Sequence, residues 1–394
     1  MSIRMPATLV ATVTILAVLL VSGCSESQTQ GREAAAAESP QVDSPASTSP
    51  AVESSPSEAS VSAAAPSDAS NILVINGCRI EPKTVCRGVD LSGAQLQGAR
   101  LMEADLTNAN LSGANLDRAI LTYSKLSGIS AQNASFVSTN LARVTAESAD
   151  FSGAVISRAV LTDADFTKAN FTGAELANNA FFSNAMSGAN LSGANIDNTW
   201  FTKSNLAVAN LTGIRGSNAI FDDSLLDHTD FSRAELDKTR FERARFIATK
   251  LEGARLTSAS FKDATFVTTS LEGLIAYGSK WTGVSLAGIN ASGADLAGGN
   301  FNGVNLSKAT LVGTNLSGAK MEAAFITEAD VTNGSLGGAN LSLANMNYAI
   351  VKNTDLTNTF MFGAKTRGVD FSTAILNDKT VCPDGYRASC AYKP

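Results

Sequence analysis

The chain has 394 residues, of which 44% are hydrophobic but only 6% aromatic, and its formal net charge is -6. It contains a single histidine, His228. One histidine excludes a multi-histidine metal cage and leaves few candidates for Ser/His/Asp or Cys/His catalysis. The mildly acidic balance gives no reason to expect nucleic-acid binding.

Residues 1–23 have the tripartite pattern of a secretory signal. Arg4 is followed by an apolar run from Ala7 to Val21, which is short for a membrane span. The sequence Val21-Ser22-Gly23-Cys24 resembles the lipobox of bacterial lipoproteins. This resemblance implies cleavage before Cys24 and a lipid on its thiol, and hence an anchor on the extracytoplasmic side of a bacterial cell membrane. The alternatives are an uncleaved anchor and an ordinary signal with an accidental cysteine.

Residues 24–70 are rich in Ser, Ala and Pro and have no periodic apolar pattern. Such a composition cannot bury enough apolar surface to fold, so we expect a disordered tether. Its root-mean-square reach is roughly 35–40 Å, which suffices to hold a folded body away from a membrane.

A period of five residues runs without interruption from Leu91 to Leu376. Every fifth residue, the centre, is nearly always large and apolar, and the residue two before it is usually Ala. Asp or Asn often precedes the centre, and Gly often follows two residues after it, as Gly93 and Gly153 do. Neither a helix nor a strand has a period of five, so the pattern indicates a repeat architecture with tight corners.

Runs such as Ala104-Asp105-Leu106-Thr107-Asn108 resemble the consensus of the pentapeptide-repeat proteins. The resemblance implies an all-β fold, a right-handed quadrilateral β-helix with one pentapeptide per side. The centre and the residue two before it would point inward. We therefore expect an N-terminal cap at 71–90, the repeat solenoid at 91–376 and a C-terminal cap at 377–394.

An aromatic column at steps of 20 residues gives an independent measure of the coil. Its members are Phe181, Phe201, Phe221, Phe241, Phe261, Trp281 and Phe301. A recurrence at 20 residues predicts four pentapeptides per coil, with rings stacked at the ~4.8 Å strand spacing. About 14 coils would then form a rod roughly 70 Å long.

Small centres are compensated by large residues at the other inward position. Ala or Gly occupies the centre at residues 131, 146, 216, 276 and 291, and the residues two before them are Ile129, Val144, Ile214, Leu274 and Ile289. Close packing requires such an exchange of volume. A disordered chain of the same composition would not show it.

The remaining cysteines lie only at the two ends of the repeat region: Cys78, Cys86, Cys382 and Cys390. Two of the three pairings would join opposite ends of a ~70 Å rod, whereas a disulfide needs Cα atoms within about 7 Å. The sequence therefore predicts Cys78–Cys86 and Cys382–Cys390 as staples of the end coils, and export makes such bonds plausible. Zinc ligation by the same residues is the alternative.

No insertion interrupts the frame, so we expect no cleft, no catalytic residue, no cofactor and no metal site. His228 follows two residues after a centre and should stand on an exposed corner. Some members of the family mimic DNA, but the charges of this repeat region nearly balance. Duplex DNA carries about one negative charge per 1.7 Å, so DNA mimicry of a topoisomerase target is disfavoured.

A run of basic residues from Lys238 to Arg255 could bind polyanions. Successive residues wind round all four sides, however, and acidic residues such as Asp223 and Asp230 lie one coil away. We interpret the run as a neutralised belt in which opposite charges pair across coils.

One side departs from the family pattern by carrying an outward apolar stripe. The positions just before its centres read Ile120, Asn140, Val160, Ala180, Trp200 and Ile220, with Phe182 nearby. An exposed apolar stripe is a candidate contact surface, although a ladder protected by its own neighbours would look the same.

These patterns predict a non-catalytic, lipid-anchored scaffold that contacts an unidentified protein at the bacterial envelope. A homo-oligomer is left open, and no nucleic-acid partner is expected. The alternative is a module that binds an envelope polysaccharide or a small ligand.

Overall fold

The computed structural model describes residues 72–386 and residue 390. The predicted signal segment, the lipidation site Cys24 and the whole of the predicted tether lie outside the described residues. The two compact units of the chain divide between Pro66 and Ser67, so the fold below concerns the second unit alone.

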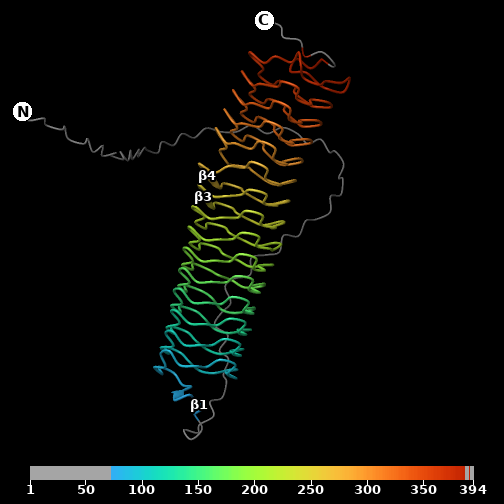
Figure 1. Cartoon of the computed structure of the whole chain (residues 1–394). Helices are drawn as coiled ribbons and strands as arrows, with labels where there is room; N and C mark the ends of the chain where they lie inside the picture. Colours follow the sequence, from blue (N-terminus) through green and yellow to red (C-terminus); the bar gives the residue numbers. More distant parts are fainter. Residues whose placement is uncertain (1–71, 387–389, 391–394) are drawn as a thin grey trace, which may run out of the picture. The chain divides into compact units, whose positions relative to one another are not determined.

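The second unit is a stack of coils that follow one another in sequence order (Figure 1). Outward residues pair in parallel with the residue 20 positions later, as in Asp90 with Asn110 and Asn110 with Ser130. Each step is closed by backbone hydrogen bonds, for example from Leu91 N to Asn110 O at 2.7 Å. The predicted coil of four pentapeptides is therefore observed.

Each corner is made by a residue in the left-handed conformation two positions after the centre. Gly93 has φ 65°, but Asn108 with φ 60° and His228 with φ 55° adopt the same conformation. The outward Asn or Asp stabilises the corner, because its side chain accepts a hydrogen bond from the backbone two residues later. Asn110 Oδ1, for example, lies 3.1 Å from Ser112 N. Glycine is thus favoured at the corner but not required.

The centres and the residues two before them form one continuous core. The predicted aromatic column is stacked throughout its length. Ring centroids are 5.0 Å apart for Phe181 and Phe201, 4.9 Å for Phe201 and Phe221, and 4.2 Å for Phe261 and Trp281. Rings from other sides also pack edge-on against the column, an arrangement that the sequence pattern had not revealed; Phe231 against Phe241 is one case.

Volume compensation between the two inward positions is also observed. The five enlarged residues are all buried: Ile129, Val144, Ile214, Leu274 and Ile289. A Cβ added at Gly216 would lie 2.6 Å from a side-chain carbon of Ile196. The core at that level is therefore already filled, as a close-packed interior requires.

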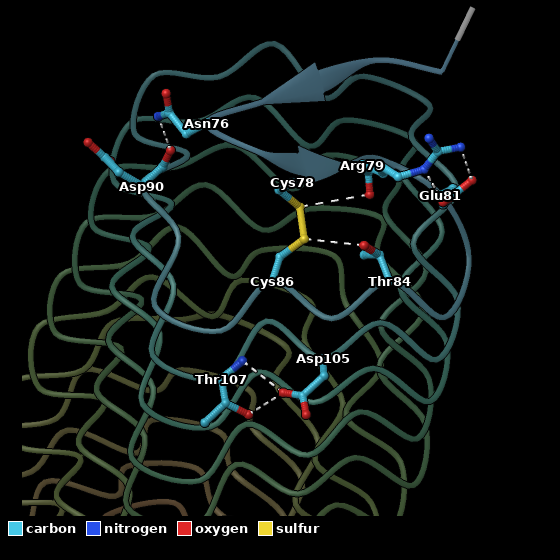
Figure 2. The surroundings of a disulfide bond; sticks show 9 residues. All are labelled: Asn76, Cys78, Arg79, Glu81, Thr84, Cys86, Asp90, Asp105 and Thr107. Atoms are coloured by element: carbon cyan, nitrogen blue, oxygen red, sulfur yellow. Dashed lines mark hydrogen bonds and ion pairs between the residues drawn. A yellow bond between two sulfur atoms is a disulfide. The ribbon is translucent and has the colours of Figure 1, made fainter. Parts of the chain in front are cut away.

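A short hairpin closes the N-terminal end of the stack. Strands β1 (Val74–Ile75) and β2 (Cys78–Arg79) pair antiparallel across the first coil (Figure 2). The Sγ atoms of Cys78 and Cys86 are 2.09 Å apart and the Cα atoms 5.5 Å apart, which is disulfide geometry. Bridges already begin at Val85 and Asp90, inside the segment predicted to be a cap. The five-residue repeat therefore begins before Leu91, because Cys86 occupies a position that is filled by a large apolar centre in later repeats.

The C-terminal end closes with a change of spacing. Asp355 still pairs with Ile375 at 20 residues, but Phe360 pairs with Val381 at 21. The Cα atoms of Cys382 and Cys390 are 5.2 Å apart, again at disulfide distance. One additional residue after Ile375 therefore ends the regular frame and brings this cysteine pair over the last coil.

A local opening interrupts two adjacent sides of the wall. Strands β3 (Arg245–Ile247) and β4 (Thr265–Val267) pair in parallel, but Thr265 has no bridge to Ser285 and Lys250 none to Ser270 within the described residues. A groove of about 280 Å³ lies there. The regular bridges continue on the other two sides, for example from Ser260 to Lys280. We call this feature the seam.

Three bulky rings meet at the seam. Phe266 stacks on Phe246 at 4.6 Å and also approaches Trp281 at 5.7 Å, while Trp281 itself stacks on Phe261. Phe266 is only partly buried, unlike the other rings of this group. The missing bridges therefore coincide with the level at which this partly buried ring lies. The unbroken frame of the sequence did not predict this interruption.

We predict that Phe201→Ala destabilises the solenoid by about 3–5 kcal/mol, because it leaves a cavity between two stacked rings. Denaturant unfolding followed by circular dichroism would measure the loss. Phe182→Ala is the matched control, since Phe182 is 40% exposed and its removal should cost less than about 1 kcal/mol. Equal losses in the two variants would contradict the assignment of the column to the core.

A second prediction concerns Asp105, which is buried beside the first coil. It accepts hydrogen bonds from Arg87 Nε at 2.8 Å and from Thr107 Oγ1 at 2.7 Å. The bond from Arg87, followed by that from Thr107, lowers the pKa of Asp105 from 3.8 to about 2. Because the folded pKa is depressed, this stabilisation is present above about pH 4 and is lost as the pH falls through about 2.

Arg87→Ala should raise the pKa of Asp105 and flatten the dependence of unfolding free energy on pH between about 4 and 2. Urea unfolding of both proteins across this pH range would measure the change. Arg118→Ala is a suitable control, since Arg118 forms no ion pair among residues 72–386. A pH profile that Arg87→Ala leaves unchanged would contradict the role given to Arg87.

Candidate interaction surface

The structure places the predicted apolar stripe on consecutive rungs of one side of the coil. Bridges run from Ile120 through Asn140, Val160, Ala180 and Trp200 to Ile220. We call this side the Trp200 face and define it by the outward positions at steps of 20 from Arg100 to Phe360. Its outward side chains therefore form a ladder without gaps.

Exposure differs along the stripe. Val160 is 48% and Trp200 53% exposed, whereas Ile120 and Ile220 are half-buried. Phe182 is 40% exposed, and the ammonium of Lys203 lies 5.6 Å from the centre of its ring. Indole and phenyl rings held on rigid backbone are typical anchors of protein contacts. The predicted residues thus share one surface, with Trp200 as its largest exposed side chain.

A second exposed apolar cluster was not predicted from the sequence. Phe360 lies at an outward position of the Trp200 face, and its ring centre is 6.4 Å from that of Phe362. Leu343 and Phe362 are also exposed, and each lies beside a glycine corner: a Cβ added at Gly363 would lie 2.9 Å from Leu343, and one added at Gly385 would lie 3.4 Å from Phe362. The sequence could have indicated that Phe360 belongs to this face, because it lies a whole number of 20-residue coils after the residues of the stripe.

Five of the six basic side chains of the run pair with an aspartate one coil earlier, and Lys238 forms no ion pair within residues 72–386. Arg243 Nε lies 2.7 Å from Asp223 Oδ1, and Lys250 Nζ lies 3.4 Å from Asp230 Oδ2. Arg255 pairs with Asp237 at 2.5 Å and not with Glu235, which precedes it by one coil in the same column. Backbone bridges do link residues 235 and 255, but the guanidinium reaches over the corner to a different carboxylate.

No group of three or more His, Cys, Asp or Glu side chains within the described range could hold a metal ion. His228 stands exposed on a corner, as its position in the repeat predicted. The described part of the chain also contains no helix of the length and apolarity needed to cross a bilayer.

A scan against protein families matches a model described as pentapeptide repeats, in 8 copies. The matched segments are 84–122, 119–158, 149–213, 209–246, 239–273, 282–322 and 326–361. The chain belongs to the pentapeptide-repeat family. Its fold is accordingly the right-handed β-helix of that family. A search of curated proteins gave no match.

A search of solved structures found similar chains, two of which follow. HetL, from the cyanobacterium Nostoc sp. and involved in regulating heterocyst differentiation, is 23% identical over 77% of this chain and 92% of its own, with a TM-score of 0.20. QnrB1, a plasmid-mediated fluoroquinolone resistance protein, is 20% identical over 52% of this chain and 92% of its own, with a TM-score of 0.28. At these identities the likeness concerns the fold alone.

Proposed function

We propose that this pentapeptide-repeat protein is a non-catalytic, lipid-anchored scaffold on the extracytoplasmic side of a bacterial cell membrane. The lipobox-like sequence before Cys24 supports the anchor, and the Ser/Ala/Pro-rich segment supports a tether between anchor and solenoid. Cysteine pairs at disulfide distance at both ends of the stack are consistent with an oxidising compartment.

The observation that carries the scaffold role is the apolar stripe of the Trp200 face, on which Val160 and Trp200 are exposed. Removing Trp200 and Val160 from water on binding would be favourable, at roughly 25 cal/mol per Å² of apolar surface. The rungs are fixed by backbone bridges, so little conformational entropy would be lost in forming the contact. Trp200 and Phe182 are the anchors of the proposed protein contact.

We predict that Trp200→Asn combined with Ile220→Asn weakens this contact at least tenfold. A photo-crosslinking residue at Lys203, which adjoins Phe182, should form a defined adduct in intact cells, and the double variant should lose it. The matched control is Val208→Asn with Ile350→Asn, which removes two exposed apolar side chains from other sides. Retention of the adduct in both variants would refute the contact surface.

The anchor is tested separately. Cys24→Ala should abolish lipid attachment, and the protein should either enter the soluble fraction or stay unprocessed. Mass spectrometry of the N-terminal peptide and membrane fractionation would measure both outcomes. A Cys78→Ala variant controls for the loss of a cysteine. An unchanged membrane fraction with an unchanged mature mass would contradict lipidation at Cys24.

A further inference from the structure

Above the apolar stripe, the Trp200 face becomes basic. Its outward positions continue from Ile220 as Arg240, Ser260, Lys280, Asn300 and Lys320, each bridged to the next. No outward position of this face, from Arg100 to Phe360, is Asp or Glu. The other three sides all carry carboxylates at outward positions, for example Asp165, Asp230 and Glu175. Of the four sides, the Trp200 face is therefore the one without Asp or Glu at its outward positions.

A groove of about 340 Å³ is centred on these basic rungs. Its lining includes Lys238, Arg240, Lys262, Lys280, Ser258 and Ser260. The lining thus combines four cationic side chains with hydroxyl groups from neighbouring coils. Glu242 is the one carboxylate of the lining. We call this feature the lysine groove.

The lysines of the groove differ from the other cations nearby in having no carboxylate partner. Arg243, Arg245, Lys250 and Arg255 each pair with an aspartate across one coil. Lys238, Lys262 and Lys280 form no ion pair in the part of the chain that the structure describes. The basic run is therefore neutralised by ion pairs except at Lys238. Lys262 and Lys280, which follow the run, add two further unpaired ammonium groups to the lining of the groove.

The carboxylates beside the groove do not cancel its charge. Asp222 is buried and engages Arg240, whose Nη2 lies 2.6 Å from Asp222 Oδ2. Glu242 accepts a hydrogen bond from Ser260 at 3.3 Å and faces Arg243 at 3.9 Å. Both acids are thus held by groups of the wall, and Arg240 is fixed in place by its aspartate. The ammonium groups of Lys238, Lys262 and Lys280, which have no carboxylate partner in the described residues, remain available to bind an anion.

We propose that the lysine groove binds a linear anionic polysaccharide, with its acidic groups aligned along the rungs of the Trp200 face. Rungs are ~4.8 Å apart, so Arg240 and Lys280, two coils apart, are separated by roughly 10 Å, and Lys320 continues the line at the same interval. A polymer with regularly spaced negative charges matches this series better than a single small anion. Each neutralised anionic group releases bound counterions, which makes the binding salt-dependent.

The lining favours a glycan over an acidic protein segment. Protein contacts depend on buried aromatic or aliphatic anchors, and none of the residues that line the groove is aromatic or aliphatic. Ser258, Ser260 and Thr282 instead offer hydroxyls that can exchange hydrogen bonds with sugar hydroxyls. The inference rests on the proposed function only in placing the chain where such polymers occur, and it does not require the protein contact at Trp200.

The purified full-length protein would be titrated with alginate as a carboxylated glycan and with a teichoic-acid-type poly(glycerol phosphate) glycan, by calorimetry at 0.15 M salt. Dextran serves as the neutral control and duplex DNA as a non-glycan polyanion. We expect at least one anionic glycan to bind, dextran not to bind, and DNA to bind at least tenfold more weakly. The preferred glycan identifies the anionic group as carboxylate or phosphate.

Lys238→Gln, Lys262→Gln and Lys280→Gln together should weaken glycan binding at least tenfold and reduce the slope of log affinity against log salt by up to about 3. The matched control, Arg243→Gln, Lys250→Gln and Arg255→Gln, removes the same charge from ion-paired positions and should change affinity less than about threefold. Equal weakening by the two triple variants would overturn the site, since only net charge would then matter.

Lysine acetylation of the wild-type protein gives a second measurement that does not depend on variants folding. Bound glycan should protect Lys238, Lys262 and Lys280 from acetic anhydride, while Lys352 and Lys365 should react as in free protein. Uniform protection, absence of anionic-glycan binding at 0.15 M salt, or DNA binding as tight as the glycan would overturn the proposal. Failure of the Cys24 or Trp200 experiments would leave these outcomes unaffected.

Discussion

The backbone ladder between successive coils is the interaction on which the whole structure depends. Outside the seam, the sides of each coil form backbone hydrogen bonds with the coils above and below, so the same residues build the wall of the core and the outer surface. The inward side chains then need only fill a channel of fixed width. Because the ladder fixes the position of outward residues as well, a sequence step of 20 becomes a straight line on the surface. Fold and surface pattern therefore come from the same geometric constraint.

This constraint explains why so much could be predicted from the sequence. The coil of 20 residues was visible in the Phe181 to Phe301 column, because only stacking in register repeats a bulky ring at that step. The exchange of volume between Gly216 and Ile214 followed from close packing. The rungs of the apolar stripe were likewise correct, because period and outward direction are local properties of a pentapeptide.

The features that escaped prediction depend on interactions between different sides of the coil. Ion-pair partners are one such feature: Arg255 reaches Asp237 across a corner, and spacing within a column says nothing about that reach. The seam is another: it lies where Phe246, Phe266 and Trp281, which come from different sides, meet, and a frame of five within one side does not show that meeting. The lysine groove combines both difficulties. Its lysines can be recognised as unpaired only when the ion pairs of the surrounding cations are known.

The seam also bears on how the solenoid would respond to load. In a stack whose coils contact only their neighbours, stability is a sum of local terms, and cooperativity passes from coil to coil through each interface. At the seam two of the four sides lack their bridges, so the coils below Lys250 and those above Ser285 are coupled mainly through the other two. A pull or a bend applied to one end would therefore concentrate its strain at this level. We expect the stack to yield first at the seam, which lies beside the lysine groove and between the apolar stripe and the C-terminal coils.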